Sequence, residues 1–143
     1  MLTAAAVIVC ALDLLGRSPG STVPIRFLSE PPPGTSRNVE GFVTRNPDTI
    51  YLITSAPAFR SAQRGPYQQG SRDACRHVAS VIVHEEWHLR YGADEEGAYL
   101  AQLTTLAALS ADGRALSSVR RSMMFAVAQQ KARRRAASTV AGP

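Results

Sequence analysis

The sequence has no apolar run long enough to span a bilayer, which takes about 20 consecutive apolar residues. It also shows no internal repeat and no composition shift that would mark a second domain. Cysteine is scarce: Cys10 and Cys75 are the only two, far apart in sequence and in no metal-ligand spacing. We therefore expect two buried free thiols, with a single disulfide as the alternative if the protein is exported.

Composition is ordinary for a globular protein, with 45% apolar and 19% charged residues. A chain of 143 residues suits one domain with one hydrophobic core. We expect that domain to cover residues 1–136, with residues 137–143 as a frayed tail. Much of the net charge of +5 lies near the C-terminus, so it describes a tail better than a nucleic-acid or membrane partner for the whole domain.

The N-terminal run Leu2–Leu12 has about the length of a signal-peptide core. However, no Lys or Arg precedes it, and Asp13 interrupts its end. We expect a buried first helix rather than a cleaved signal, and cytoplasmic location is favoured over export.

Glycine and proline divide the chain into segments that predict an α+β fold. The fold would have an N-terminal helix, a short and mainly antiparallel sheet, and three further helices. The run Ile50–Ile53 is apolar throughout, as in a strand that is covered on both faces or lines a cleft. The expected helices are Thr3–Leu15, Arg72–Tyr91, Asp94–Leu109 and Ala115–Arg135, the expected strands are Thr22–Leu28, Gly41–Thr44 and Thr49–Thr54, and Ser55–Ser71 is expected to be a polar connection.

His84 and His88 are four residues apart, so on a helix they lie on one face, one turn from each other. Two imidazole nitrogens placed in this way can reach one zinc ion at about 2.0–2.1 Å. Glu85 lies about 100° further round the helix, close enough to address a water on the metal without being a ligand. Zinc lowers the pKa of bound water towards 7, and a neighbouring carboxylate can take the proton and pass it to a leaving amine. The spacing therefore fits metal-assisted hydrolysis of an amide.

The helix around this motif is apolar over most of its circumference, so it must be largely buried. Two histidines and a glutamate on a buried helix are unfavourable unless something satisfies them, and a metal ion would do so. The alternatives are a solvated helix face with two unremarkable histidines, or a small helical interaction protein in which the motif is accidental.

A catalytic zinc normally has a third protein ligand, and Asp94, Glu95 and Glu96 follow His88 closely. They open the next helix, where Asp94 can act as a cap while Glu95 and Glu96 complement the helix dipole. These roles are compatible with metal binding. Periodicity does not separate the three, because each glutamate shares a helix face with buried positions.

The sequence His84-Glu85-x-x-His88 followed by Glu95-x-x-Ala98-Tyr99 resembles the zincin metallopeptidases, and among them compact gluzincins. The resemblance covers residues 75–106. It implies His84, His88 and Glu95 as zinc ligands, Glu85 as general base and acid, and an extended peptide or protein substrate along an edge strand. The short spacer before Glu95 requires the two helices to pack as a tight hairpin, and Asp94 stands where metzincins place their third ligand.

Tyr99 and His77 are secondary candidates, as donors to the oxyanion that forms in amide hydrolysis, although core packing explains both. The groove is expected to be shallow, with Ser55–Ser71 as a flap. The basic run Lys131–Arg135 reads as a solvated helix end, with nucleic-acid or acidic-lipid binding as the alternative. The leading function is a zinc-dependent peptidase. The alternative is a non-catalytic, metal-binding regulatory module with a protein or nucleic-acid partner.

Overall fold

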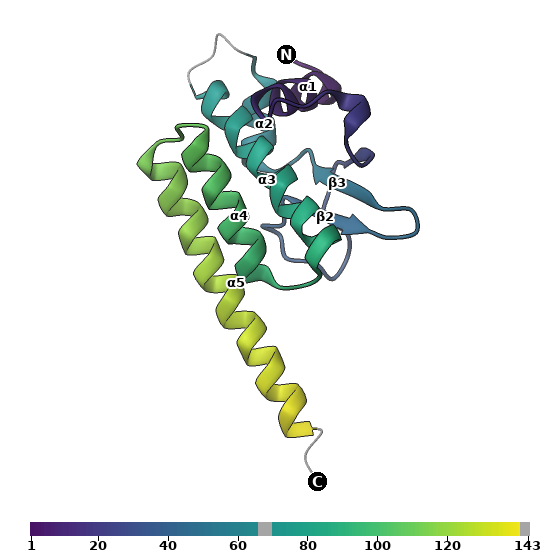
Figure 1. Ribbon diagram of the computed structural model, residues 1–143, viewed down its shortest axis with the longest axis vertical. Coiled ribbons are helices and arrows are strands. Elements are labelled where there is room, and N and C mark those ends of the chain that lie inside the picture. Colours follow the sequence, from purple (N-terminus) through teal and green to yellow (C-terminus); the bar gives the residue numbers. More distant parts are fainter. Residues whose placement is uncertain (66–69, 141–143) are drawn as a thin grey trace.

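The computed structural model describes residues 1–65 and 70–140 and confirms the α+β fold (Figure 1). Helices α3, α4 and α5 lie beside one another, while α1 and α2 cover the N-terminal half of α3. No described helix has the length and hydropathy needed to cross a membrane. The elements are α1 (Ala4–Leu14), a 3-10 turn η1 (Pro19–Ser21), β1 (Ile25–Leu28), β2 (Gly41–Thr44), β3 (Thr49–Ile53), α2 (Pro57–Gln63), α3 (Ser71–Tyr91), α4 (Glu95–Ala108) and α5 (Gly113–Val140).

The sheet is mixed rather than mainly antiparallel. Its order is β1-β3-β2, with β1 parallel and β2 antiparallel to the central strand β3. Strand β1 ends at Leu28 and β2 begins at Gly41, and both residues lie near the carboxyl end of β3. Residues 29–40 connect the two outer strands around this end of the sheet without a crossover helix. Ile50, Leu52 and Ile53 are at most 1% exposed and Tyr51 is half-buried, so most of the apolar run is covered, and Ile53 also lines the cleft described below. Strand β2 is left as an edge strand, next to α3.

Helix α1 belongs to the core, as its apolar sequence predicts. Val7 and Ala11 are completely buried, and α1 packs against α3. The expectation of two free thiols is wrong, because Cys10 of α1 and Cys75 of α3 form a disulfide. The packing of the two helices brings the Cα atoms to 6.4 Å, within the range that a disulfide spans. Sequence spacing could not reveal this, since the cysteines are 65 residues apart.

Part of the expected connection Ser55–Ser71 is helical. Pro57 begins α2 at a position where its missing N–H costs no hydrogen bond, and Phe59 and Ala62 on one side of the helix are buried in the core. Ser55, Ala56 and Pro57 line the cleft described below, so the start of this connection lies beside the site, and its role as a flap stays a prediction. Residues 66–69 lie outside the described part of the chain.

Helix α5 begins at Gly113 and continues to Val140, beyond the expected end at Arg135. No glycine or proline interrupts residues 114–140, and alanines at 136 and 137 favour the helix. Residues 137–140 of the expected tail are thus helical, and residues 141–143 lie outside the described part.

Candidate metal centre

His84 and His88 lie on the face of α3 that is turned toward α4. Their rings meet edge to face with centroids 4.9 Å apart, and their Nε2 atoms are 3.2 Å apart. His84 is 7% exposed, so its imidazole has little contact with bulk water. Because α3 is uninterrupted from Ser71 to Tyr91, the spacing of the two rings follows from helix geometry alone.

Glu95 is the first residue of α4 and completes the group. Gly92, with a φ of 96°, ends α3 and allows the chain to reverse. Asp94 caps α4 by accepting the N–H of Glu96 at 3.2 Å. Glu95 then places Oε1 3.2 Å from His88 Nε2 and Oε2 3.5 Å from His84 Nε2. The structure thus brings together His84, His88 and Glu95, the three residues named as ligands, and leaves Asp94 and Glu96 outside this group.

The separations of the three donor atoms can be compared with what zinc requires. A tetrahedral zinc with bonds of about 2.0–2.1 Å holds its ligand atoms about 3.3–3.4 Å apart. The two Nε2 atoms are 3.2 Å apart, while the Glu95 separations of 3.2 and 3.5 Å belong to its two different carboxylate oxygens. One ligand atom from each residue can be chosen so that all three lie within 4.8 Å of one another, so the group could hold one ion, and His₂Glu is a donor set of catalytic zinc sites.

A second layer of hydrogen bonds orients both imidazoles. His84 Nδ1 donates to Gln102 Oε1 at 3.0 Å, and Gln102 Nε2 donates to Ser80 Oγ at 3.2 Å. His88 Nδ1 donates to the Gly92 carbonyl at 2.8 Å. With both Nδ1 atoms acting as donors, Nε2 of each ring is left to face Glu95, and without its proton each Nε2 would present a lone pair to the space between the three side chains.

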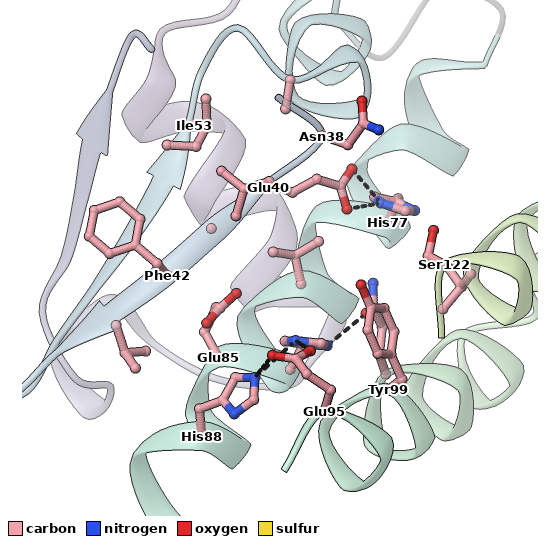
Figure 2. Close-up of a pocket in the computed structure, with 18 of the residues that line it drawn as sticks. Asn38, Glu40, Phe42, Ile53, His77, Glu85, His88, Glu95, Tyr99 and Ser122 are labelled. Atoms are coloured by element: carbon pink, nitrogen blue, oxygen red, sulfur yellow. Dashed lines mark hydrogen bonds and ion pairs between the residues drawn. The ribbon is translucent and has the colours of Figure 1, made fainter. Parts of the chain in front are cut away.

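Glu85 is 5% exposed and extends from α3 toward β2 (Figure 2). A Cβ on Gly41 would lie 2.9 Å from the Tyr51 carbonyl oxygen and 3.3 Å from Glu85 Cγ, so glycine at this position lets β2 lie close to β3 and leaves room for Glu85. Burial raises the pKa of Glu85 to about 7, although the charges of His84 and His88 lower it. The carboxyl group is therefore poised to exchange a proton near neutral pH.

The charges of the three candidate ligands depend on one another. Burial alone would raise the pKa of Glu95, but hydrogen bonds with His84 and His88 outweigh burial and lower it to about 2. Burial would lower the pKa of His88, but the hydrogen bonds with Glu95 and the Gly92 carbonyl raise it. A metal cation bound by these nitrogen atoms would therefore have to displace protons from them.

These groups line a cleft of about 850 Å³ (Figure 2). Residues 37–43, which end in the edge strand β2, form one wall, and residues of α4 and α5 form the other. Glu85 and His88 lie between the two walls, on α3 (Figure 2), and His84 of the same helix also lines the cleft. The three candidate ligands and Glu85 therefore face a space that is open to a substrate.

The two secondary candidates differ in position. The Tyr99 ring packs edge to face on His84 at 4.5 Å and also lines the cleft. Burial and the nearby charges of Glu95, Glu40 and Glu85 raise its pKa to about 12, so its hydroxyl keeps its proton. His77 Nε2 instead bonds both carboxylate oxygens of Glu40, at 2.8 and 2.9 Å.

Sequence reasoning missed Gln102, Ser80 and Glu40 as parts of the site. Gln102 had a usable signal, because a polar residue seven positions after Glu95 lies on the same, otherwise apolar, face of its helix. Ser80 and Glu40 gave no comparable signal, since small or charged residues at such positions are common.

No protein-family model matches the chain, and neither curated proteins nor solved structures yielded a match. The functional argument therefore rests on the geometry of this site.

Proposed function

We propose that the protein is a zinc-dependent peptidase that hydrolyses peptide bonds in the cleft between β2 and α4. The observation that supports this most strongly is the convergence of ligand atoms from His84, His88 and Glu95 to within 4.8 Å of one another, with Glu85 beside them in an open cleft. Two imidazoles and one carboxylate leave a fourth tetrahedral position for the reaction, as catalytic zinc sites do.

Each residue has a defined role in this proposal. Zinc, when bound by His84, His88 and Glu95, supplies Lewis-acid catalysis and makes water acidic enough to attack at neutral pH. The Glu85 carboxylate accepts the proton of the attacking water and delivers it to the nitrogen of the leaving amine. Gln102 and the Gly92 carbonyl hold the two imidazoles in their tautomer and orientation.

The edge strand β2 supports a polypeptide substrate. The Glu40 backbone carbonyl accepts the Ile53 N–H at 2.9 Å, and Gly41 pairs with Leu52 in register. Because hydrogen-bonded residues alternate in an antiparallel pair, Gly41 and Val43 direct their backbone groups to the open edge. Both residues line the cleft, so an extended peptide can add as a further strand there.

Replacement of Glu85 by Gln tests the proposal. Zinc-loaded wild type and Glu85→Gln are incubated with a mixed-sequence peptide library, and the products are identified by mass spectrometry. We expect the wild type to cut the library and Glu85→Gln to bind zinc normally but to lose at least about 100-fold in rate, the lower range for general-base catalysis.

Glu86→Gln is the matched control, since Glu86 follows Glu85 but forms an ion pair with Arg17, in the segment after α1, instead of facing the ligands. It should retain both zinc and hydrolysis. If the zinc-loaded wild type cuts no peptide in the library, the peptidase proposal fails and the non-catalytic metal-binding module becomes the better account.

A further inference from the structure

Helix α5 separates the charges of the chain. Seven of the sixteen Lys and Arg residues lie in α5, and all eleven Asp and Glu residues lie outside it, so the rest of the chain has a net charge of −2. All seven cations are exposed, and none forms an ion pair with any residue that the structure describes. They are Arg114, Arg120, Arg121, Lys131, Arg133, Arg134 and Arg135.

Most of these cations share one face of the helix. At 3.6 residues per turn, all except Arg133 fall within a sector of about 160°, and they extend over about 32 Å of the helix axis. Val119, which is 2% exposed and packs toward the rest of the domain, lies outside this sector. The result is a basic stripe on the solvent side of α5 in two groups, Arg114 to Arg121 and Lys131 to Arg135, with the uncharged residues 122–130 between them.

The end of α5 projects from the domain (Figure 1). Gln130 marks the last turn that contacts the body, because it donates to the Ala93 carbonyl at 2.8 Å and accepts the Glu95 N–H at 3.3 Å. Residues 131–140 are all exposed. We call these ten residues the basic arm, since they include Lys131 and the three arginines that follow it.

We propose that α5 binds duplex DNA through phosphate contacts that do not depend on base sequence, with the basic arm as its principal contact. A helix about 10–12 Å in diameter fits the B-DNA major groove, which is about 12 Å wide. Arginine binds phosphate oxygens in pairs, and six of the seven cations are arginines. This inference goes beyond peptide hydrolysis and requires neither zinc nor Glu85.

Two features favour a groove over a flat anionic membrane. Arg133 lies opposite the basic stripe, and a helix in a groove meets phosphates on both sides, whereas a helix on a membrane meets lipid on one side. Val140 is the only apolar side chain of the basic arm larger than alanine, and the exposed Met124 and Phe125 lie before the arm, whereas interfacial helices need a face of large apolar residues beside their cations.

The test is fluorescence anisotropy with a labelled duplex of about two helical turns, between about 50 and 200 mM salt. The arm variant carries Lys131→Gln, Arg133→Gln, Arg134→Gln and Arg135→Gln. A matched control removes four exposed cations from the body, through Arg26→Gln, Arg60→Gln, Arg64→Gln and Arg72→Gln. Circular dichroism verifies that both variants keep their helix content.

We expect the arm variant to bind at least about tenfold more weakly than wild type, and the control within about twofold. The slope of log affinity against log salt should fall by up to about 3.6 in the arm variant, because each phosphate contact contributes about 0.9. Glu85→Gln and zinc removal should leave DNA binding unchanged, which separates this proposal from the peptidase proposal.

Three results would overturn it. The first is no DNA binding by the wild type at about 50 mM salt. The second is equal weakening in the arm variant and the control, which would show dependence on net charge alone. The third is tighter binding to phosphatidylglycerol vesicles or to duplex RNA than to duplex DNA.

Discussion

Gln102 is not a candidate ligand, but its hydrogen bond orients the imidazole of His84. It is 3% exposed, and its amide links the imidazole of His84 to Ser80, so both ends of the amide are used. In Gln102→Leu the side chain keeps a similar volume but leaves His84 Nδ1 without an acceptor in a buried site. We expect zinc affinity to fall by about 10- to 100-fold, as is usual for such outer-shell partners.

Competition against a zinc-binding dye measures this affinity. Gln129→Leu, at an exposed position of α5, is the control and should bind zinc like wild type. Unchanged affinity in a folded Gln102→Leu protein would show that the hydrogen bond does not orient His84.

The His77–Glu40 pair makes a pH-dependent contribution to stability. Burial lowers the pKa of His77, but the hydrogen bond and the charge of Glu40 outweigh burial and raise it above the usual 6.5. The pair's stabilisation is therefore fully present below pH 6.5 and is lost as the pH rises through the folded-state pKa.

Glu40→Gln should thus destabilise the protein more at pH 5.5 than at pH 8.5. The expected difference is about 1 kcal/mol or less, because Glu40 is partly exposed. Thermal unfolding of wild type and variant at both pH values provides the measurement, and a destabilisation that grows with pH would contradict the assignment.

At the scale of elements, the α3–α4 hairpin positions Glu95 against the histidines. A Cβ on Gly97 would lie 2.1 Å from Trp87 Cζ2, so the hairpin closes only because residue 97 is glycine. We expect Gly97→Ala to destabilise the domain by about 1–3 kcal/mol, as overpacking usually does, and to weaken zinc binding by displacing Glu95.

Urea unfolding and dye competition test both effects of Gly97→Ala. Gly113→Ala is the control, since a Cβ at Gly113 would meet no atom within 4 Å. Equal stability of the two variants would mean that Trp87 moves aside without cost and that the hairpin is less constrained than we describe.

The elements differ in how far the sequence predicts them. Helix α3 and the end at Gly92 are predictable, because a long apolar pattern and a glycine cap are local signals. Helix α2 is missed because Pro57–Gln63 is too short to show a period, and only Phe59 and Ala62 are buried. The parallel pairing of β1 with β3 depends on contacts between distant segments, which no local pattern encodes.

The candidate site divides in the same way. The relation of His84, Glu85 and His88 is a property of one helix and is readable from spacing. The choice among Asp94, Glu95 and Glu96 depends on how α4 packs against α3, a contact between segments that includes the close approach of Gly97 to Trp87 and that no local pattern encodes.

At the scale of the whole molecule, the disulfide joins α1 to the helix that carries the histidines. Closing a loop of 65 residues restricts the unfolded chain, which corresponds to about 4 kcal/mol in the chain-entropy account. We expect the double variant Cys10→Ser/Cys75→Ser to unfold at a clearly lower urea concentration than wild type. A free thiol titration that finds two thiols in the untreated wild-type protein would contradict the pairing.

Cytoplasmic location stays a prediction, and the disulfide counts against it because disulfides are rare in reducing compartments. Cell fractionation with an antibody to the protein decides between the cytoplasm and export.

The most direct test of the central claim is the zinc content of the purified protein, measured by mass spectrometry for wild type and His88→Ala side by side. We predict about one zinc per chain in the wild type and almost none in His88→Ala, because two ligands do not hold the ion as three do. Absence of metal in the wild type, even after zinc is added to the metal-free protein, would contradict the assignment of His84, His88 and Glu95 as a metal centre.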